Sequence, residues 1–247
     1  MKKTVAATLF FAALAIVPIS ALAQTGSHDD ILRQIEIKRT ELSALENEFL
    51  SPSEEDRANY AEFLKQPDTG LIRLLPREIY ESDTYRKNKK TLTVRGGGAY
   101  YSFSRLSHVY DNGTDIGLEQ GYLQVGFAGA DYGMMTNLGD VPLDEITLEH
   151  RMVNFLAEYK APVEEPKARS EYRRFATGTA INDSLYKTRL PVAVNQTYLL
   201  RSISYDASDV LVVLRVVRKD TDGSIIIAWK LLKRNPKPEL ARNKTEQ

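Results

Sequence analysis

Residues 197–234 read "TYLLRSISYDASDVLVVLRVVRKDTDGSIIIAWKLLKR", three apolar runs separated by the short polar segments DASD and DTDG. The runs at 197–205, 210–219 and 224–234 are rich in β-branched and aromatic residues, which favour strands. Asp, Ser and Gly in the segments between them are typical of tight turns. We therefore predict an antiparallel meander. Its last two strands are apolar on both faces over half their length, so we expect them to be central and covered on both sides.

Two further segments upstream have the composition of strands. Residues 99–110, "AYYSFSRLSHVY", are rich in aromatic residues and predict one continuous strand. "DNGTD" at 111–115 has Asn-Gly at its centre, a pair that tolerates positive φ, and predicts a turn. "GYLQVGF" at 121–127 would be the return strand. We therefore expect the sheet to extend well upstream of the meander.

Helical spacing interrupts this β-rich region once. Met152, Phe155, Leu156 and Tyr159 fall at helical intervals and predict one helix. The charged, proline-containing segment 163–174 is interpreted as a surface connection. The expected body, residues 68–236, is a mainly antiparallel β-sandwich or partly open barrel with one or two helices. A polar tail would follow at 237–247, and the fold class is α+β.

The segment before the body, residues 24–67, has a helical pattern. Alternating four- and three-residue steps, typical of a short coiled coil, connect Ile31, Ile35, Leu42, Leu45 and Phe49, with Lys38 at one seam position. A second helix is expected from Pro52 to about Lys65, capped by Ser51. Either these helices pack onto the body, or residues 28–66 form a helical hairpin that self-associates or binds a protein partner.

The first residues resemble a signal peptide. Lys2 and Lys3 precede a mostly apolar run, and Ala21-Leu22-Ala23 has the small-x-small pattern of a cleavage site. Residues 1–23 are therefore predicted to be removed after Ala23, which would place the protein in the periplasm or outside the cell. The apolar run is short for a membrane span, and we expect no transmembrane span in the mature chain.

Composition restricts the function further. The chain has no cysteine, so it forms no disulfide and offers no thiol nucleophile. Lys plus Arg and Asp plus Glu both number 33, and this balance argues against a nucleic-acid partner. The histidines are scattered and form no H-E-x-x-H motif. We predict no cofactor.

The segment around Gly96–Gly98 is a candidate ligand site. The three glycines do not complete G-x-G-x-x-G and are interpreted as a bulge or a close backbone approach. Tyr100, His108 and Tyr110 would share one face of the predicted strand, and with Arg105 they are the candidate ligand-binding residues. The alternative is that these side chains pack within the sheet.

Oxygen ligands for calcium occur in the following turn. Asp111, Asn112 and Asp115 could ligate the ion, but they lack the complete EF-hand pattern, and hairpin turns select the same residues. The sequence thus favours an exported, non-catalytic binding or accessory protein of the bacterial envelope. One alternative is a glycan- or peptidoglycan-directed hydrolase with paired carboxylates. The other is an oligomeric subunit of an envelope assembly.

Overall fold

The computed structural model describes residues 27–80, 92, 96–127 and 129–241. The chain divides into two compact units, Met1–Leu42 and Ser43–Gln247. The predicted signal peptide and the end of the predicted tail lie outside the described residues. Within the described part, no helix combines the length and the apolar character that crossing a membrane requires.

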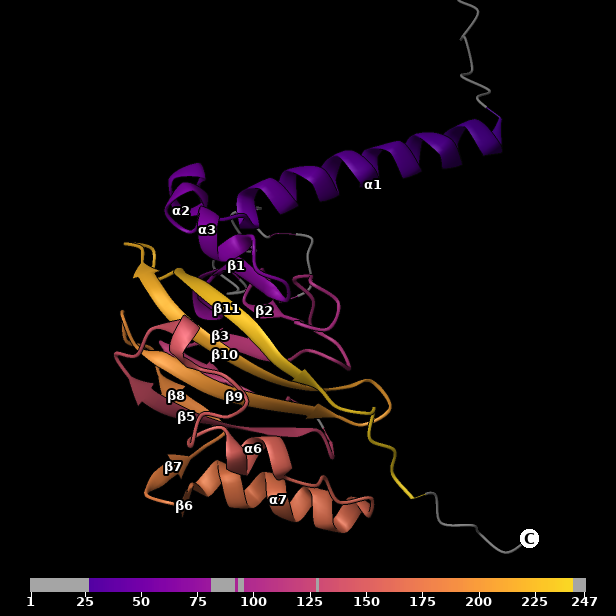
Figure 1. The fold of residues 1–247 in the computed structure, drawn as a ribbon. Coiled ribbons are helices and arrows are strands. Elements are labelled where there is room, and N and C mark those ends of the chain that lie inside the picture. The colour runs from indigo at the N-terminus through magenta and orange to yellow at the C-terminus, as the bar shows by residue number, and fades with distance from the viewer. Residues whose placement is uncertain (1–26, 81–91, 93–95, 128, 242–247) are drawn as a thin grey trace, which may run out of the picture. The chain divides into compact units, whose positions relative to one another are not determined.

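The predicted meander forms the centre of the larger sheet (Figure 1). Strands β9 (Thr197–Ser204), β10 (Ser208–Lys219) and β11 (Ile225–Arg234) pair antiparallel in sequence order. β1 (Thr69–Leu74) adds to the free edge of β11, and β5 (Tyr132–Gly139) adds to that of β9. The order β1-β11-β10-β9-β5 confirms the meander and the central position of its last two strands.

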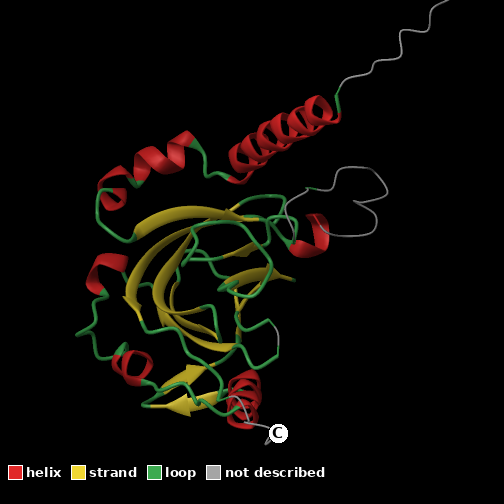
Figure 2. Ribbon diagram, turned by 90° about the vertical axis from the view of Figure 1, so that its right-hand side faces the viewer, coloured by secondary structure: helices red, strands yellow, loops and turns green. Residues whose placement is uncertain are grey.

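A smaller antiparallel sheet has the order β2-β3-β4-β8. Its strands are β2 (Tyr100–Tyr101), β3 (Ile116–Glu119), β4 (Tyr122–Gln124) and β8 (Arg189–Pro191). The two sheets curve around a shared interior (Figure 2). A separate two-stranded ladder pairs β6 (Thr179–Ile181) with β7 (Ser184–Tyr186).

Both faces of the larger sheet are covered, as predicted. On one face, Leu214 shares a buried cluster with Leu118 of the smaller sheet. On the other face, Val213 shares a cluster with Leu156 and Phe175, which come from the helices outside the sheet. The alternation along β10 therefore sends successive apolar side chains into two different cores.

The helices of the body differ from the sequence prediction in two places. Helix α6 (Asn154–Glu158) lies in the predicted helical segment, but it is a single short turn. The segment interpreted as a surface connection is instead helix α7 (Glu165–Thr177), which ends at Gly178. Ala168 and Phe175, seven residues apart on one side of α7, are buried. The charged residues of α7 occupy its exposed sides, where Arg169 pairs with Glu165. They made the narrow apolar face hard to recognise in the sequence.

The predicted strand at 99–110 is also corrected. Only Tyr100 and Tyr101 are in a strand, and Ser102 bridges back to Ser107 in a tight loop. Leu106 closes this loop with φ of 54°. Since the chain reverses here, residues before and after the loop do not share the alternating faces that a continuous strand would give.

The N-terminal helices begin with α1 (His28–Leu50), which matches the predicted first helix. The second predicted helix is two short ones, α2 (Glu54–Asn59) and α3 (Ala61–Leu64). Ser53, rather than Ser51, caps α2, and it forms a reciprocal capping box with Asp56. Two further short helical elements in the part of the chain that the structure describes are α4 (Arg77–Tyr80) and the 3-10 turn η1 (Leu143–Glu145).

The glycine run serves packing. Gly98 has φ of 78°, and a Cβ placed there would overlap Leu50 and lie 3.1 Å from Leu75. Leu50, at the end of α1, is buried in one cluster with Leu75 and Tyr80. The absence of a side chain at Gly98 therefore lets the last turn of α1 anchor to the body, and the close-approach interpretation of the glycines is confirmed.

Candidate functional site

Two of the predicted ligand-binding residues lie together, Tyr100 in β2 of the smaller sheet and Tyr110 in the segment between β2 and β3. The rings of Tyr100 and Tyr110 stack with centroids 4.3 Å apart, and the Arg77 guanidinium lies 5.7 Å and 5.9 Å from their centroids. Glu119 accepts hydrogen bonds from the Tyr100 hydroxyl and from Arg77, the latter at 2.6 Å. Arg77 and Glu119 are 42 residues apart in the chain, and no local motif in the sequence relates them.

The electrostatics of this cluster favour a fixed ion pair. Burial and the hydrogen bond to Glu119 raise the pKa of Tyr100 far above its ordinary value. Burial alone would raise the pKa of Glu119, but the hydrogen bonds from Tyr100 and Arg77 outweigh it and hold that pKa below its ordinary value. The cluster is therefore a neutral phenol and an ionised carboxylate under an arginine, and Tyr100 itself is fully buried.

The other two predicted ligand-binding residues lie elsewhere. His108 Nε2 is 2.7 Å from the carbonyl oxygen of Arg73, and its ring packs edge-on against Tyr101 at 5.1 Å. Burial lowers the pKa of His108. Arg105 forms a two-pronged ion pair with Asp111. The structure thus brings Tyr100 and Tyr110 together and places His108 against β1; ligand binding by these residues stays a prediction.

The predicted calcium ligands have separate partners. Asp111 pairs with Arg105, while the Nδ2 group of Asn112 lies 3.5 Å from the carbonyl oxygen of Tyr205. The Asp115 carboxylate is buried and accepts the backbone N–H of Phe103 at 2.7 Å. Among the residues that the structure describes, there is no group of three or more His, Cys, Asp or Glu side chains that could hold a metal ion. Calcium binding here stays a prediction.

The pKa of the Asp115 carboxyl group departs strongly from its ordinary value. Burial raises its pKa from the ordinary 3.8 to about 6, and hydrogen bonds from Phe103 N–H and the Ser102 hydroxyl offset only part of that rise. The Asp115 side chain fixes the tight loop that follows β2, since it accepts the backbone N–H of Phe103 within that loop. Its role in the structure is therefore to hold the loop closed.

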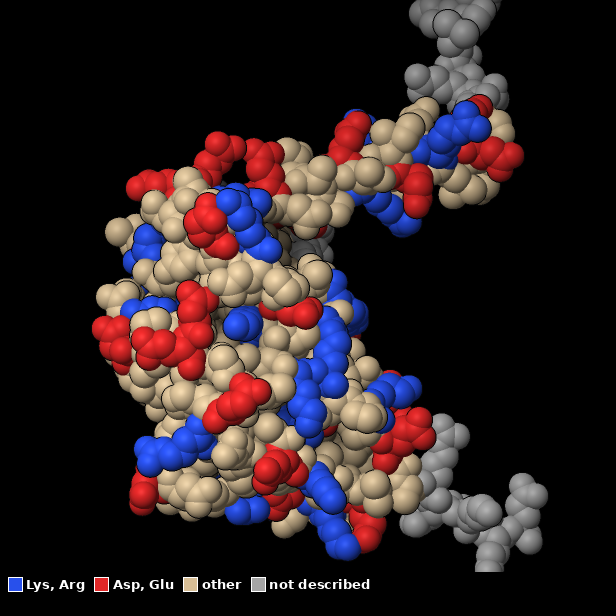
Figure 3. Space-filling model, in the orientation of Figure 1, with Lys and Arg blue, Asp and Glu red and all other residues tan. Residues whose placement is uncertain are grey.

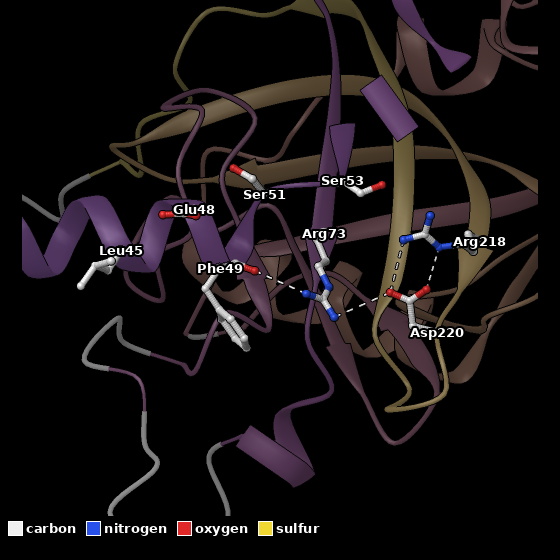
Figure 4. A pocket seen from close by; sticks show the side chains of 8 residues that line it. All are labelled: Leu45, Glu48, Phe49, Ser51, Ser53, Arg73, Arg218 and Asp220. Carbon is white, nitrogen blue, oxygen red and sulfur yellow. Dashed lines mark hydrogen bonds and ion pairs between the residues drawn. The ribbon is translucent and has the colours of Figure 1, made fainter. Parts of the chain in front are cut away.

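A pocket of about 470 Å³ opens between the end of α1, the end of β1 and the end of β10. Asp220 lies between two arginines, 3.7 Å from Arg73 and 2.6 Å from Arg218 (Figure 4). Arg73 also donates to the carbonyl oxygen of Phe49 at 3.4 Å. The other lining residues come from α1 and the loop after it, and they are Leu45, Glu48, Ser51 and Ser53.

The ion pairs continue away from the pocket as one network. Arg218 binds Asp56 of the α2 capping box, and Arg73 lies 3.3 Å from Asp222. Burial alone would raise the pKa of Asp222, but hydrogen bonds from Ser224 and Tyr80 outweigh it and lower that pKa. The network links α2, β1, α4 and the β10–β11 turn. Asp56, Asp220 and Asp222 in this network are each engaged by an arginine side chain.

A second buried network, which was not predicted from the sequence, holds α6 and α7 on the face of the larger sheet that is turned away from the smaller sheet. Arg201 pairs with Asp209 at 2.8 Å, and both side chains are nearly fully buried. Arg201 also donates to the carbonyl oxygen of Tyr159 at 2.6 Å, just beyond α6. The Tyr159 hydroxyl in turn donates to Glu171 of α7 at 2.7 Å. Removing one partner from such a pair leaves a buried charge uncompensated.

Helix α1 carries an apolar surface. The seam residues predicted from the sequence lie on it with between 41 and 63% of their surface exposed; they are Ile31, Ile35, Leu42, Leu45 and Phe49. Lys38, within the seam, forms an ion pair with Glu41 at 2.7 Å. A run of exposed apolar side chains along one stripe of a helix is typical of a surface that binds another helix or groove.

Acidic and basic side chains are interspersed over the face of the molecule that Figure 3 shows. Comparison with known proteins finds no matching family model, no similar curated protein and no similar solved structure. A proposal for the function therefore rests on the residues of this chain alone.

Proposed function

We propose that this protein is an exported, non-catalytic module of the bacterial envelope that binds a protein partner through α1. The observation that carries the proposal is the exposed heptad stripe from Ile31 to Phe49. Burying such side chains is favourable by roughly 25 cal/mol for each Å² of apolar surface removed from water. Export is supported by the signal-like residues 1–23.

The body would act as the anchor of this helix. We infer that its two sheets form a β-sandwich, because their facing side chains belong to one buried cluster. Leu50 fixes the last turn of α1 to that body, and Arg73 binds the carbonyl oxygen of Phe49. A partner bound along α1 would therefore be attached to the body through this last turn.

The hydrolase alternative has less support. It requires a carboxylic acid of raised pKa that faces a cleft. In the pocket beside the end of α1, Asp220 lies between Arg73 and Arg218 instead, and both arginines engage its carboxylate. Two of the described carboxyl groups have a pKa raised by burial. Asp115 is buried and accepts the backbone N–H of Phe103, and Asp131 accepts the backbone N–H of Tyr205.

Site-specific photo-crosslinking in the bacterium tests the proposal. A photo-reactive residue at Ile35, on the stripe, is expected to give crosslinked adducts in the envelope fraction. The same residue at Thr40, on the opposite side of the helix, is the control and is expected to give none. Equal labelling from both positions, or accumulation in the cytoplasm with Met1 retained, would contradict the proposal.

A further inference from the structure

We propose that the partner of α1 is a second copy of this chain, bound as an antiparallel two-helix coiled coil. This inference rests on the proposed function, which makes α1 the docking helix. In heptad terms Ile31, Lys38 and Leu45 occupy the d positions, and Ile35, Leu42 and Phe49 occupy the a positions. Two copies of the stripe are complementary when the helices run antiparallel and are not complementary when they run parallel.

Parallel pairing places each seam residue beside its own equivalent. Lys38 would then face Lys38 of the second copy in the centre of the seam, where two ammonium groups repel and lose water. At the flanks, Glu41 in the g position would meet Glu46 of the second copy in the e position. Both contacts are unfavourable, so the parallel arrangement is disfavoured by the charges of α1.

Antiparallel pairing matches the whole stripe. Ile31 then packs on Phe49 of the second copy, Ile35 on Leu45, and Lys38 on Leu42. Lys38 would lay its aliphatic stem over that leucine and extend its ammonium toward Glu41 of the second copy. Within one chain Lys38 already pairs with Glu41 at 2.7 Å, so the required side-chain direction is available.

The antiparallel arrangement places like charges only at the flanking e and g positions, so its electrostatic cost is smaller than that of the parallel arrangement. Arg39 lies beside Arg39 of the second copy, and Glu41 lies beside its own equivalent. These side chains are exposed, Arg39 by 75%, and like charges at such positions cost little because water and salt screen them. The opposed helix dipoles add a small favourable contribution. Three heptads make a marginal coiled coil, so we expect a weak, concentration-dependent dimer.

Disulfide trapping tests the orientation, because the natural chain contains no cysteine. Ile35→Cys and Leu45→Cys proteins, each purified in full after export and carrying different tags, are oxidised alone and as a mixture. Antiparallel pairing predicts mixed disulfides in excess over both homodimers, since the thiol at position 35 of one copy would face the thiol at position 45 of the other. Thr40→Cys, on the outer face, is the control and is expected to crosslink only at the random background.

The possible outcomes separate this inference from the proposed function. Predominant Leu45→Cys homodimers would show parallel pairing and overturn the antiparallel inference. Background crosslinking throughout, together with a concentration-independent sedimentation coefficient, would overturn self-association. If photo-crosslinks from Ile35 to a different protein persisted in that case, the proposed function would stand with another partner. If those adducts were also missing, the proposed function would fail as well.

Discussion

Asp115 gives a quantitative prediction for stability as a function of pH. Its carboxyl group has a pKa of about 6 in the folded protein because it is buried, against an ordinary 3.8. Between these two values the folded state binds more protons than the unfolded state, so stability falls as pH rises. The destabilisation is absent below the lower pKa and complete above the upper one. Two pKa units correspond to about 3 kcal/mol.

The Asp115→Asn variant isolates this effect. Asparagine keeps an oxygen that can accept the Phe103 N–H but carries no charge to desolvate. We predict that the free energy of unfolding of Asp115→Asn, minus that of the natural protein, increases by about 3 kcal/mol from roughly pH 3.5 to pH 7. Taking the difference removes the titrations that both proteins share.

Urea unfolding followed by tryptophan fluorescence is a suitable assay. Trp229, the sole tryptophan of the chain, is 4% exposed in β11 and reports on the body. Asp183→Asn, at an exposed turn, is the matched control for the replacement of a carboxylate by an amide. A difference that is flat with pH for Asp115→Asn would refute the conclusion that this carboxylate is ionised at a cost in the folded state.

Three further predictions concern packing and covalent structure. His108→Ala is expected to lower the free energy of unfolding by about 1–3 kcal/mol, since it removes the contact with the Arg73 carbonyl and leaves a void; an unchanged urea midpoint would instead favour an open ligand site. Gly98→Ala is expected to lower the Tm, because its Cβ would overlap Leu50 at a positive φ; an unchanged Tm would show that the last turn of α1 can shift freely. Thermal melts with and without dithiothreitol should coincide, because the chain has no cysteine. A Tm shift of more than about 2 °C, which corresponds to a stability change of about 0.5–1 kcal/mol, would contradict this prediction.

The larger sheet could be predicted from sequence because its signals are local. The meander has long apolar runs separated by turn residues, and its two-sided apolar character follows from central placement. Helix α7 escaped prediction because only Ala168 and Phe175 are buried among charged residues. The chain reversal after Tyr101 was not predicted because the loop is stabilised by Asp115, which lies outside it in the sequence. Tertiary hydrogen bonds overrode a local strand preference there.

In the candidate site, too, features with a local sequence pattern could be predicted and features that depend on tertiary contacts could not. The stripe on α1 was visible because helical periodicity is a local pattern. By contrast, the partners of Tyr100 could not be predicted, since Arg77 and Glu119 come from separate elements. The capping residue was misassigned for a related reason: Ser51 and Ser53 both precede acidic residues, and the choice of Ser53 follows from Asp56, which also binds Arg218.

Whether the apolar stripe of α1 serves a partner or this chain's own core can be decided by the urea midpoint of Leu42→Asp. The midpoint is followed by Trp229 fluorescence at a protein concentration too low for association. Leu42 is 42% exposed, and substitutions at such positions change stability by about 0.5 kcal/mol or less. If the stripe serves a partner, as proposed, the midpoint will be indistinguishable from that of the natural protein. A clear fall in the midpoint would show that the stripe belongs to the folded core and that a partner is not its purpose.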